Sequence, residues 1–528
     1  MKNLLSCFAM MLLIPTTLLS SCQQEEEKTP LPPAEAPVIR LLLEDLVAAH
    51  EGGDYAIEYV VEHPVEGQKP EVEAADAWIE DIQVDLTHIR FTVLANDENR
   101  DRSTKLTVSY SGAETTCEAQ ISQLRTAYRS DVFAMPSSAS IPYRIPAIAV
   151  TSQGRLIAVA DYRHSRQDIG VVHNGRIDLH YRISDDHGLT WGETQTLIEG
   201  QGADSPDFMN VGYGDPCIVA DRESDRVLIL SCAGNVSYPN GSRNNHQCIA
   251  RFYSEDGGQT WSQPEDIAES IYSQFDEGNN GPVRSMFVAS GRIYQSRFVK
   301  VNDYYRLYCA VLMRNVNGVS MNFVLYSDDF GGNWSVLGGV DRAPVSQTAD
   351  EAKVEELPDG SLLISSRWDG GRYFNIFTFD DPIQATGSWG TKSFSGASNK
   401  GVVAEGNATN GELLVLPVVR NRDGEAMYLL LQSLPLGPGR ANVGIYYQEL
   451  ATAEDYESPV AVARKWEGVY QVTRLGSAYS TMDFQKDHTI GFLWEESTYC
   501  TEGGGYTIAY DKFTVEALTN GAYSYREE

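Results

Sequence analysis

The sequence predicts an all-β protein in which a β-propeller follows a small β-sandwich. Beyond about residue 126, short apolar runs alternate with Gly, Asn and Asp, and the pattern Ser-x-Asp-x-Gly-x-Thr-Trp recurs at Ser184, Ser254 and, with Asn for Thr, Ser327. The copies begin 70 and 73 residues apart, so one supersecondary unit repeats, as in propeller blades. Residues 38–124 show period-two alternation that breaks about every ten residues, which is typical of a sandwich.

The repeated pattern makes physical sense as a hairpin turn. Its Asp can accept hydrogen bonds from backbone N–H groups of a tight loop, and the Gly two residues later can adopt positive φ. The final Trp can pack into the blade. We therefore interpret the three copies as structural turns and exclude their aspartates from the functional site, namely Asp186, Asp256 and Asp329.

The N-terminus has the features of a targeting segment. Lys2 gives a positive start, and Leu4–Leu19 is mostly apolar but short for a membrane span. The string Leu19-Ser20-Ser21-Cys22 resembles a bacterial lipobox, which predicts a signal peptide over residues 1–21 and lipidation of Cys22. Residues 22–37, rich in Glu and Pro, are then a tether. We expect a secreted protein held by its lipid anchor in the outer membrane, facing the exterior or the periplasm; the alternative is a plain signal peptide with an incidental cysteine.

The charge balance narrows the range of partners. Asp and Glu number 73 against 41 Lys and Arg, for a formal charge of −32. Nucleic acid is excluded as a partner because its affinity depends on Lys and Arg that neutralise phosphates. An anionic ligand needs a locally cationic pocket in such a chain. The eight cysteines show no CxxC pair and no metal-ligand spacing, so neither a metal nor a cofactor is predicted; Cys232 and Cys248 could form a disulfide or stay buried thiols.

Five short motifs follow one another within residues 126–528. They are Tyr143-Arg144-Ile145-Pro146, Asp350 to Gly360 with Ser365-Ser366-Arg367 after it, Gly439 to Tyr446, Gly476 to Met482, and Gly491 to Glu495. Together they resemble the bacterial exo-α-sialidase (neuraminidase) family with its (F/Y)RIP motif, and the repeated turn resembles that family's Asp box. The resemblance implies a six-bladed β-propeller over residues 126–528 that hydrolyses terminal sialic acid and retains the configuration of the sugar. Its partners are then sialylated glycans on glycoproteins, mucins and gangliosides.

The resemblance also implies a clamp for the substrate carboxylate, made by Arg144, Arg367 and Arg440. Sialic acid carries a carboxylate on its anomeric carbon, and guanidinium groups bind carboxylates through bidentate, charge-assisted hydrogen bonds. Glu495 is expected to orient Arg144 through a buried ion pair. Asp215 matches a position that lines the pocket near the substrate's 4-hydroxyl, and Arg163 is expected to assist there.

Tyr479 is the nucleophile that the resemblance implies. A carboxylate nucleophile would be repelled by the substrate's carboxylate, whereas a neutral phenol is not, and sialidases differ in this way from glycosidases that use two carboxylates. With a pKa of about 10, the phenol needs a base, and Glu351 fits that role. Asp168, 24 residues after Arg144, fits the acid that protonates the leaving oxygen and then activates water.

Residues 38–124 carry a second resemblance. The strings Trp78-Ile79, Asn96 to Arg100, Leu106 to Gly112 and Ile121-Ser122-Gln123 resemble the BACON family of Ig-like domains. This implies an Ig-like sandwich beside a glycan-active enzyme, serving either as a mucin-binding module or as a spacer.

Two alternatives for the propeller stay open. One is a sialic-acid-binding propeller without activity, which would keep the arginines but lose Tyr479, Glu351 or Asp168. The other is an intramolecular trans-sialidase that releases an anhydro sugar. The motif residues do not separate this second alternative from a hydrolase, because loops above the pocket decide whether water reaches the intermediate.

Overall fold

The structure is a computed structural model that describes residues 36–48, 52–96, 102–123, 129–134, 143–406, 409–473, 475–497 and 506–527. The predicted signal peptide, Cys22 and the tether up to residue 35 lie outside these ranges. Within the ranges, no helix is both long enough and apolar enough to cross a membrane.

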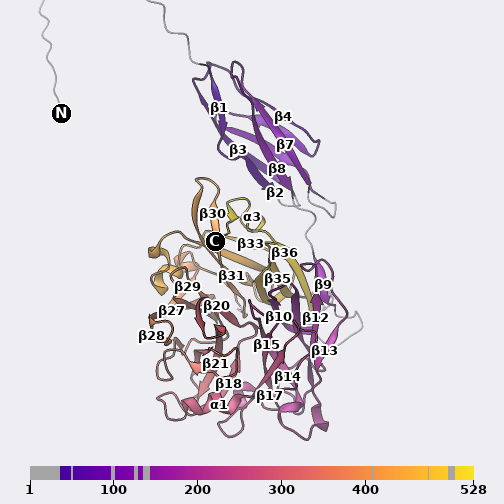
Figure 1. Ribbon diagram of the computed structural model, residues 1–528, viewed down its shortest axis with the longest axis vertical. Coiled ribbons are helices and arrows are strands. Elements are labelled where there is room, and N and C mark those ends of the chain that lie inside the picture. The colour runs from indigo at the N-terminus through magenta and orange to yellow at the C-terminus, as the bar shows by residue number, and fades with distance from the viewer. Residues whose placement is uncertain are drawn as a thin grey trace, which may run out of the picture.

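The N-terminal part of the described chain consists of two four-stranded sheets (Figure 1). One has the strand order β1-β3-β6-β5 and the other β2-β8-β7-β4. The strands are β1 (Val38–Leu41), β2 (Asp45–Ala48), β3 (Gly53–Glu62), β4 (Glu71–Ala74), β5 (Ile79–Val84), β6 (His88–Val93), β7 (Arg102–Ser109) and β8 (Cys117–Gln123). Alternate side chains from both sheets, such as Ile57, Phe91 and Leu106, share one core whose buried members all lie within residues 39–121.

Six further sheets follow in the described residues from 130 onward. The first holds β10 (Tyr143–Val150), β11 (Leu156–Arg163), β12 (Ile177–Ser184) and β13 (Gln195–Ile198). The second holds β14 (Tyr213–Ala220), β15 (Val227–Ala233), β16 (Cys248–Ser254), β17 (Glu265–Asp266) and β19 (Gly291–Arg292). The third holds β18 (Val283–Val288), β20 (Tyr294–Val301), β21 (Tyr304–Asn315), β22 (Ser320–Ser327), β23 (Ser335–Val336) and β24 (Val345–Ser346).

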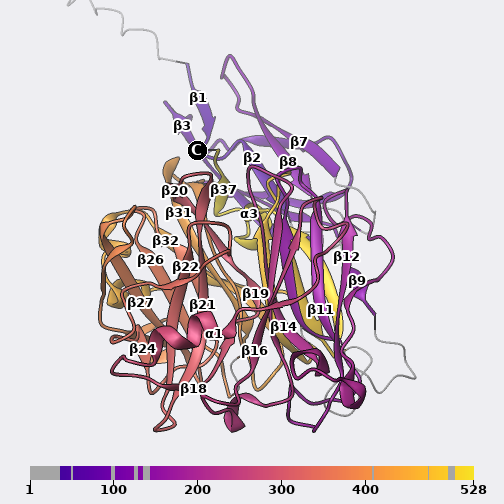
Figure 2. The same ribbon diagram turned by 60° about the horizontal axis from the view of Figure 1, so that its bottom comes forward.

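The fourth sheet holds β25 (Ala352–Glu356), β26 (Leu362–Trp368), β27 (Gly371–Asp381), β28 (Thr386–Trp389) and β29 (Ser393–Gly396). The fifth holds β30 (Leu413–Arg420), β31 (Glu425–Pro435), β32 (Val443–Leu450), β33 (Gly468–Gln471) and β37 (Tyr523–Tyr525). The sixth holds β34 (Ser477–Phe484), β35 (Ile490–Glu496), β36 (Thr507–Phe513) and β9 (Ser130–Phe133). The α-helices are short: α1 (Ala268–Tyr272), which packs beside β18 (Figure 2), α2 (Pro459–Val462) and α3 (Val515–Leu518).

The sixth sheet joins the two ends of this region. Strand β9 comes first in the chain, yet it pairs antiparallel with β36, with Phe133 opposite Ile508. One sheet therefore contains strands from both ends of the region. Their pairing closes the six sheets into a ring.

The three repeated turns have the same hydrogen bonds. In the first copy, Asp186 accepts from the backbone N–H of Thr190 at 2.9 Å, and Gly188 has φ +83°. In the second, Asp256 accepts from the Thr260 N–H at 2.9 Å. In the third, Asp329 accepts from the N–H of Asn333 at 2.8 Å, so Asn replaces Thr without changing the turn. Because each carboxylate accepts hydrogen bonds from its own loop, these aspartates have a structural role in the turns.

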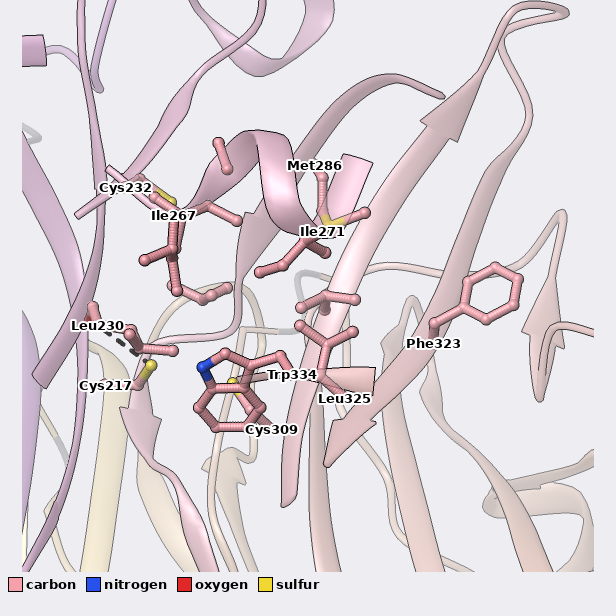
Figure 3. Packing of buried hydrophobic residues seen from close by; sticks show 14 of the residues in the cluster. Cys217, Leu230, Cys232, Ile267, Ile271, Met286, Cys309, Phe323, Leu325 and Trp334 are labelled. Carbon is pink, nitrogen blue, oxygen red and sulfur yellow. Dashed lines mark hydrogen bonds between the residues drawn. The ribbon is translucent and has the colours of Figure 1, made fainter. Parts of the chain in front are cut away.

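Apolar clusters fill the spaces between neighbouring sheets. The cluster between the second and third sheets contains Cys217, Leu230, Cys309, Phe323 and Trp334 (Figure 3). Dispersion contacts in such tightly packed interiors stabilise the folded state. The described cysteines that lie in the propeller region are buried free thiols, so the possible disulfide is not formed; they are Cys217, Cys232, Cys248 and Cys309.

A shortened protein lacking residues 23–124 is expected to fold. The sandwich core shares no residue with the clusters of the later sheets. Where the two parts meet, residues of both, including Leu42, His88, Arg422 and Tyr523, line a cavity of about 360 Å³. Because the two cores are separate, we expect loss of the sandwich to move the thermal unfolding midpoint of the remaining chain by no more than about 4 °C. Circular dichroism melts of both lengths would show it, and a noncooperative transition in the shortened protein would contradict it.

Candidate active site

Most of the residues predicted for the site meet around one cavity. The cavity has a volume of about 310 Å³. Seven predicted residues line it: Arg144, Asp168, Asp215, Glu351, Arg367, Arg440 and Tyr479. They come from the beginnings of β10, β14 and β34, from the residue before β25, from the end of β26 and from two loops. Long-range pairing of the sheets therefore assembles side chains that are more than 300 residues apart in the chain.

Three strands of the site are irregular at the site residue itself. The pairing of β10 with β11 shifts between Arg144 and Ala147, and that of β34 with β35 shifts between Ser477 and Ser480. The pairing of β14 with β15 shifts in the same way around Asp215, whose φ is +52°. Such bulges turn a side chain out of the regular pleat and occur often beside active sites. Here they allow Arg144, Asp215 and Tyr479 to face the cavity at the strand ends.

Tyr479 and Glu351, which both line the cavity, form a hydrogen-bonded pair. The phenol oxygen of Tyr479 lies 3.0 and 2.9 Å from the two carboxylate oxygens of Glu351, and both side chains are buried. Nη1 of Arg367 donates to Glu351 Oε2 at 2.5 Å and to the Tyr479 oxygen at 3.0 Å. The phenol proton thus has a carboxylate acceptor in place, and a cation lies next to the oxygen that would lose it.

Burial governs the ionisation of this pair. It raises the pKa of Tyr479, and the nearby Glu351 raises it further, while Arg367 opposes the shift. Burial likewise raises the pKa of Glu351, with Arg367 again acting in the opposite direction. Tyr479 is therefore protonated at neutral pH, and proton transfer to Glu351 has to accompany any attack by the phenol oxygen.

Glu495 connects two elements of the site. It accepts from Nε of Arg144 at 2.7 Å and from the backbone N–H of Ile145 at 2.8 Å. Its other oxygen accepts from the N–H of Tyr479 at 3.0 Å. Glu495 has no exposed surface, so this carboxylate fixes Arg144 and the Tyr479 backbone relative to each other without facing the cavity. The guanidinium of Arg144 lies 5.5 Å from the ring centre of Tyr479, and that of Arg440 lies 5.8 Å from it.

The structure places Arg163 differently from the prediction. Its guanidinium is buried and donates to Asp161 at 3.0 and 2.8 Å and to Asp168 at 2.5 Å. It lies behind Asp168 and is not among the residues that line the cavity. Arg163 therefore holds Asp168 in place, and the expected direct contact with a substrate is not supported, because its donors are already bound by two carboxylates.

The pKa values of Asp168 and Asp215, which both line the cavity, shift in opposite directions. For Asp168, whose side chain is 70% exposed, desolvation by the cavity wall raises the pKa, but the charge and hydrogen bond of Arg163 outweigh it and lower the pKa overall. For Asp215, burial and the neighbouring Asp161 raise the pKa well above its ordinary value. Burial also raises the pKa of Asp161 to about 6. Before a ligand binds, Asp168 is thus a stronger acid than an ordinary aspartic acid, and Asp215 is a weaker one.

Several cavity residues were missed by the sequence reasoning. Gln247, which is 4% exposed, precedes β16, and Tyr238 and Phe287 line the same wall. Asp350 stands beside Glu351. Asp350 belongs to the motif that contains Glu351 but was assigned no role. Gln247, Tyr238 and Phe287 belong to no motif, so only proximity in the fold identifies them. In the described part of the chain, no group of three or more His, Cys, Asp and Glu side chains could hold a metal ion.

Fold and site together define a β-propeller protein with a cavity that three arginines line around a tyrosine–glutamate pair. No family model matches the chain. The chain is 28% identical over 376 residues to a curated sialidase from Micromonospora viridifaciens, across 67% of this chain and 50% of that protein. Among solved structures, Hadza microbial sialidase Hz136 has a TM-score of 0.56 at 19% identity and covers 82% of this chain and 77% of its own.

A second solved structure is the intramolecular trans-sialidase from Ruminococcus gnavus in complex with oseltamivir carboxylate. It has a TM-score of 0.55 at 18% identity over 74% of this chain and 98% of its own. The chain thus has sialidase homologues and shares the β-propeller fold of solved sialidases. It spans about half the length of the curated relatives that it matches.

Proposed function

We propose that this protein is an exo-α-sialidase that removes terminal sialic acid from glycoproteins, mucins or gangliosides with retention of configuration. The observation that carries the proposal is the Tyr479 phenol, hydrogen-bonded to Glu351 at 2.9 Å within a cavity that three arginines line. Homology to curated sialidases supports the same substrate class. Taking the six sheets after residue 130 as one blade each gives the six-bladed architecture that we propose with it.

The reaction begins with capture of the substrate carboxylate by Arg144, Arg367 and Arg440. Because Arg367 also contacts the phenol oxygen, a carboxylate bound there brings the anomeric carbon next to Tyr479. The phenol oxygen forms a bond to the anomeric carbon while its proton passes to Glu351. The bond to the leaving oxygen breaks at the same time, and that oxygen takes a proton from Asp168.

The second half of the reaction releases the sugar. Asp168 takes a proton from water, whose oxygen attacks the anomeric carbon. The bond to Tyr479 breaks, and the phenol oxygen recovers its proton from Glu351. Each half inverts the anomeric centre, so the product keeps the original configuration.

Substrate binding favours the uptake of a proton from solvent by Asp168. Arg144 and Arg440 are among the cations that lower the pKa of Asp168. A substrate carboxylate bound to those arginines compensates their charge and adds a negative charge of its own, so the pKa of Asp168 rises on binding. Asp168 is then a general acid in the complex, although it is ionised in the free protein.

Incubation with sialyllactose tests the proposal. We expect lactose and free sialic acid, with the α-anomer appearing first in NMR spectra recorded during turnover. Glu351→Gln serves as the control. It keeps the shape of the side chain but is a much weaker base for the phenol proton of Tyr479, so it should lose turnover.

Other products would decide against the proposal in specific ways. First appearance of the β-anomer would contradict retention. An anhydro sugar would identify an intramolecular trans-sialidase, and binding without turnover of any sialoside would identify a sialic-acid-binding propeller.

A further inference from the structure

Arg372 is a buried cation without a carboxylate partner in the described part of the chain. Among the residues that the structure describes, three arginines are fully buried: Arg163, Arg306 and Arg372. Arg163 is bound by Asp161, and Arg306 is bound by Asp328 at 2.6 and 2.9 Å. The donors of Arg372 go instead to neutral oxygens: Ser365 Oγ at 2.9 Å, Ser365 O at 3.0 Å and Thr409 O at 3.0 Å.

The position of Arg372 makes this arrangement unfavourable for stability. In the pairing of β26 with β27, Arg372 stands directly opposite Arg367. Directly opposed residues point to the same face of a sheet, and like charges placed there repel each other. Burial, followed by the charge of Arg367, lowers the pKa of Arg372 to about 9. A hydrophobic side chain would avoid this cost, which suggests a role for the charge elsewhere.

A short chain of contacts leads from Arg372 to the reacting tyrosine. Arg372 Nη1 donates to the carbonyl of Thr409, and Thr409 Oγ1 donates to the carbonyl of Ala478 at 3.0 Å. Ala478 directly precedes Tyr479, at the bulge that turns the phenol into the cavity. Arg372 and Thr409 are completely buried, and neither lines the cavity. Arg372 therefore reaches the site only through other residues.

We propose that Arg372 is a positioning residue for the reaction: through Thr409 it holds the backbone that carries Tyr479, and its unpaired charge favours the ionised form of Glu351. This inference rests on the proposed sialidase function. The charged and titratable groups that the described chain places around Glu351 are Arg367 and Asp350 beside it, Tyr479 from β34, Asp215 from β14, Cys232 from β15 and Arg372 from β27. Of these, Arg372 is a cation that no carboxylate of the described chain neutralises.

The sign of the effect follows from Glu351 acting as the base. Glu351 must be ionised to accept the phenol proton, so activity falls as the pH drops through its pKa. A neighbouring cation lowers that pKa, and removal of the cation raises it. Loss of the Arg372 charge therefore moves the acidic limb of the kcat/KM profile to higher pH.

The test compares Arg372→Met, Arg372→Lys and Thr409→Val with Arg306→Met as a matched control. For Arg372→Met we expect kcat on an aryl sialoside to fall by about tenfold or more, with KM little changed. The acidic limb should rise by about half a pH unit or more. Arg372→Lys keeps the charge and should restore the limb but only part of kcat. Thr409→Val should lower kcat without moving the limb.

The control separates this role from a structural one. Arg306→Met removes an equally buried arginine that is far from Glu351, so it should lower thermal stability and leave the pH profile in place. If Arg372→Met also leaves the limb and kcat unchanged, or if Arg372→Lys shifts the limb as far as Met does, the inference is overturned. Absence of turnover in the unaltered protein would instead reject the proposed function.

Discussion

Tyr479→Phe is expected to abolish turnover while leaving the pocket able to bind sialic acid. Phenylalanine has no oxygen to attack the anomeric carbon, so kcat should fall by at least about a thousandfold. The carboxylate clamp is unchanged, and the dissociation constant for sialic acid should therefore change little. Rates with an activated aryl sialoside and calorimetric titration with sialic acid measure the two quantities separately.

A trapping experiment identifies the nucleophile directly. In a 3-fluoro sialosyl fluoride, the fluorine at C3 slows both steps by its inductive effect, while the good leaving group still allows the first step. We expect a covalent adduct that peptide mapping assigns to Tyr479. Tyr238→Phe is the matched control, because Tyr238 lines the same cavity and should not affect adduct formation. An adduct on any other residue of the unaltered protein would show that Tyr479 is not the nucleophile.

Arg367→Ala is expected to produce the largest loss of binding. A hydrogen bond to a charged group contributes about 1.5–3 kcal/mol, so loss of this guanidinium should weaken binding of a carboxylate-bearing analogue by about tenfold to a hundredfold. An analogue with a neutral hydroxymethyl group in place of the carboxylate should be almost insensitive. Calorimetric titration with both analogues makes the comparison, and Arg144→Ala should show the same pattern.

Arg222 is the control for the arginine clamp, because it lies at the other end of β14 from the candidate active site. Arg222 follows the end of β14, whereas Asp215 lies near its beginning, and Arg222 borders a separate cavity there. Arg222→Ala should leave both affinities unchanged. Equal losses for the charged and the neutral analogue in Arg367→Ala would mean that the arginine stabilises the fold and does not bind the carboxylate.

Much of the architecture could be predicted because its signals are local. The repeated turn is encoded within eight residues, and its Asp, Gly and hydroxyl or amide side chain bond to the loop that contains them. Strands such as Tyr143–Val150 and Ile490–Glu496 are nearly continuous apolar runs, as expected for strands buried between sheets. The order of the motifs also identified Glu351 and Tyr479 as candidate site residues, and the fold places them within hydrogen-bonding distance of each other.

The role of Arg163 could not be predicted from the sequence. The family resemblance suggested that Arg163 assists Asp215 near the substrate's 4-hydroxyl. In the structure, the carboxylates of Asp161 and Asp168 bind its guanidinium, and burial removes it from the cavity wall. Gln247, Tyr238 and Arg372 carried no signal at all. The location of a side chain within a sheet depends on register and on the bulges that shift it, and these are decided by pairing partners distant in the chain.

Local patterns in the sequence were enough to predict that the chain is built from strands, that one turn repeats at a regular spacing, and which side chains are available to bind a carboxylate. Three features follow only from the folded chain. Strand β9 completes the last sheet, the pKa values of Asp168 and Asp215 shift in opposite directions, and an arginine without a carboxylate partner, Arg372, contacts the backbone before Tyr479 through Thr409. The two sets of features differ because the interactions behind them act between residues at different separations in the chain. Hydrogen bonds within a turn and the alternation of a strand act over a few residues, whereas burial and charge act between residues that only the closed ring of sheets brings together.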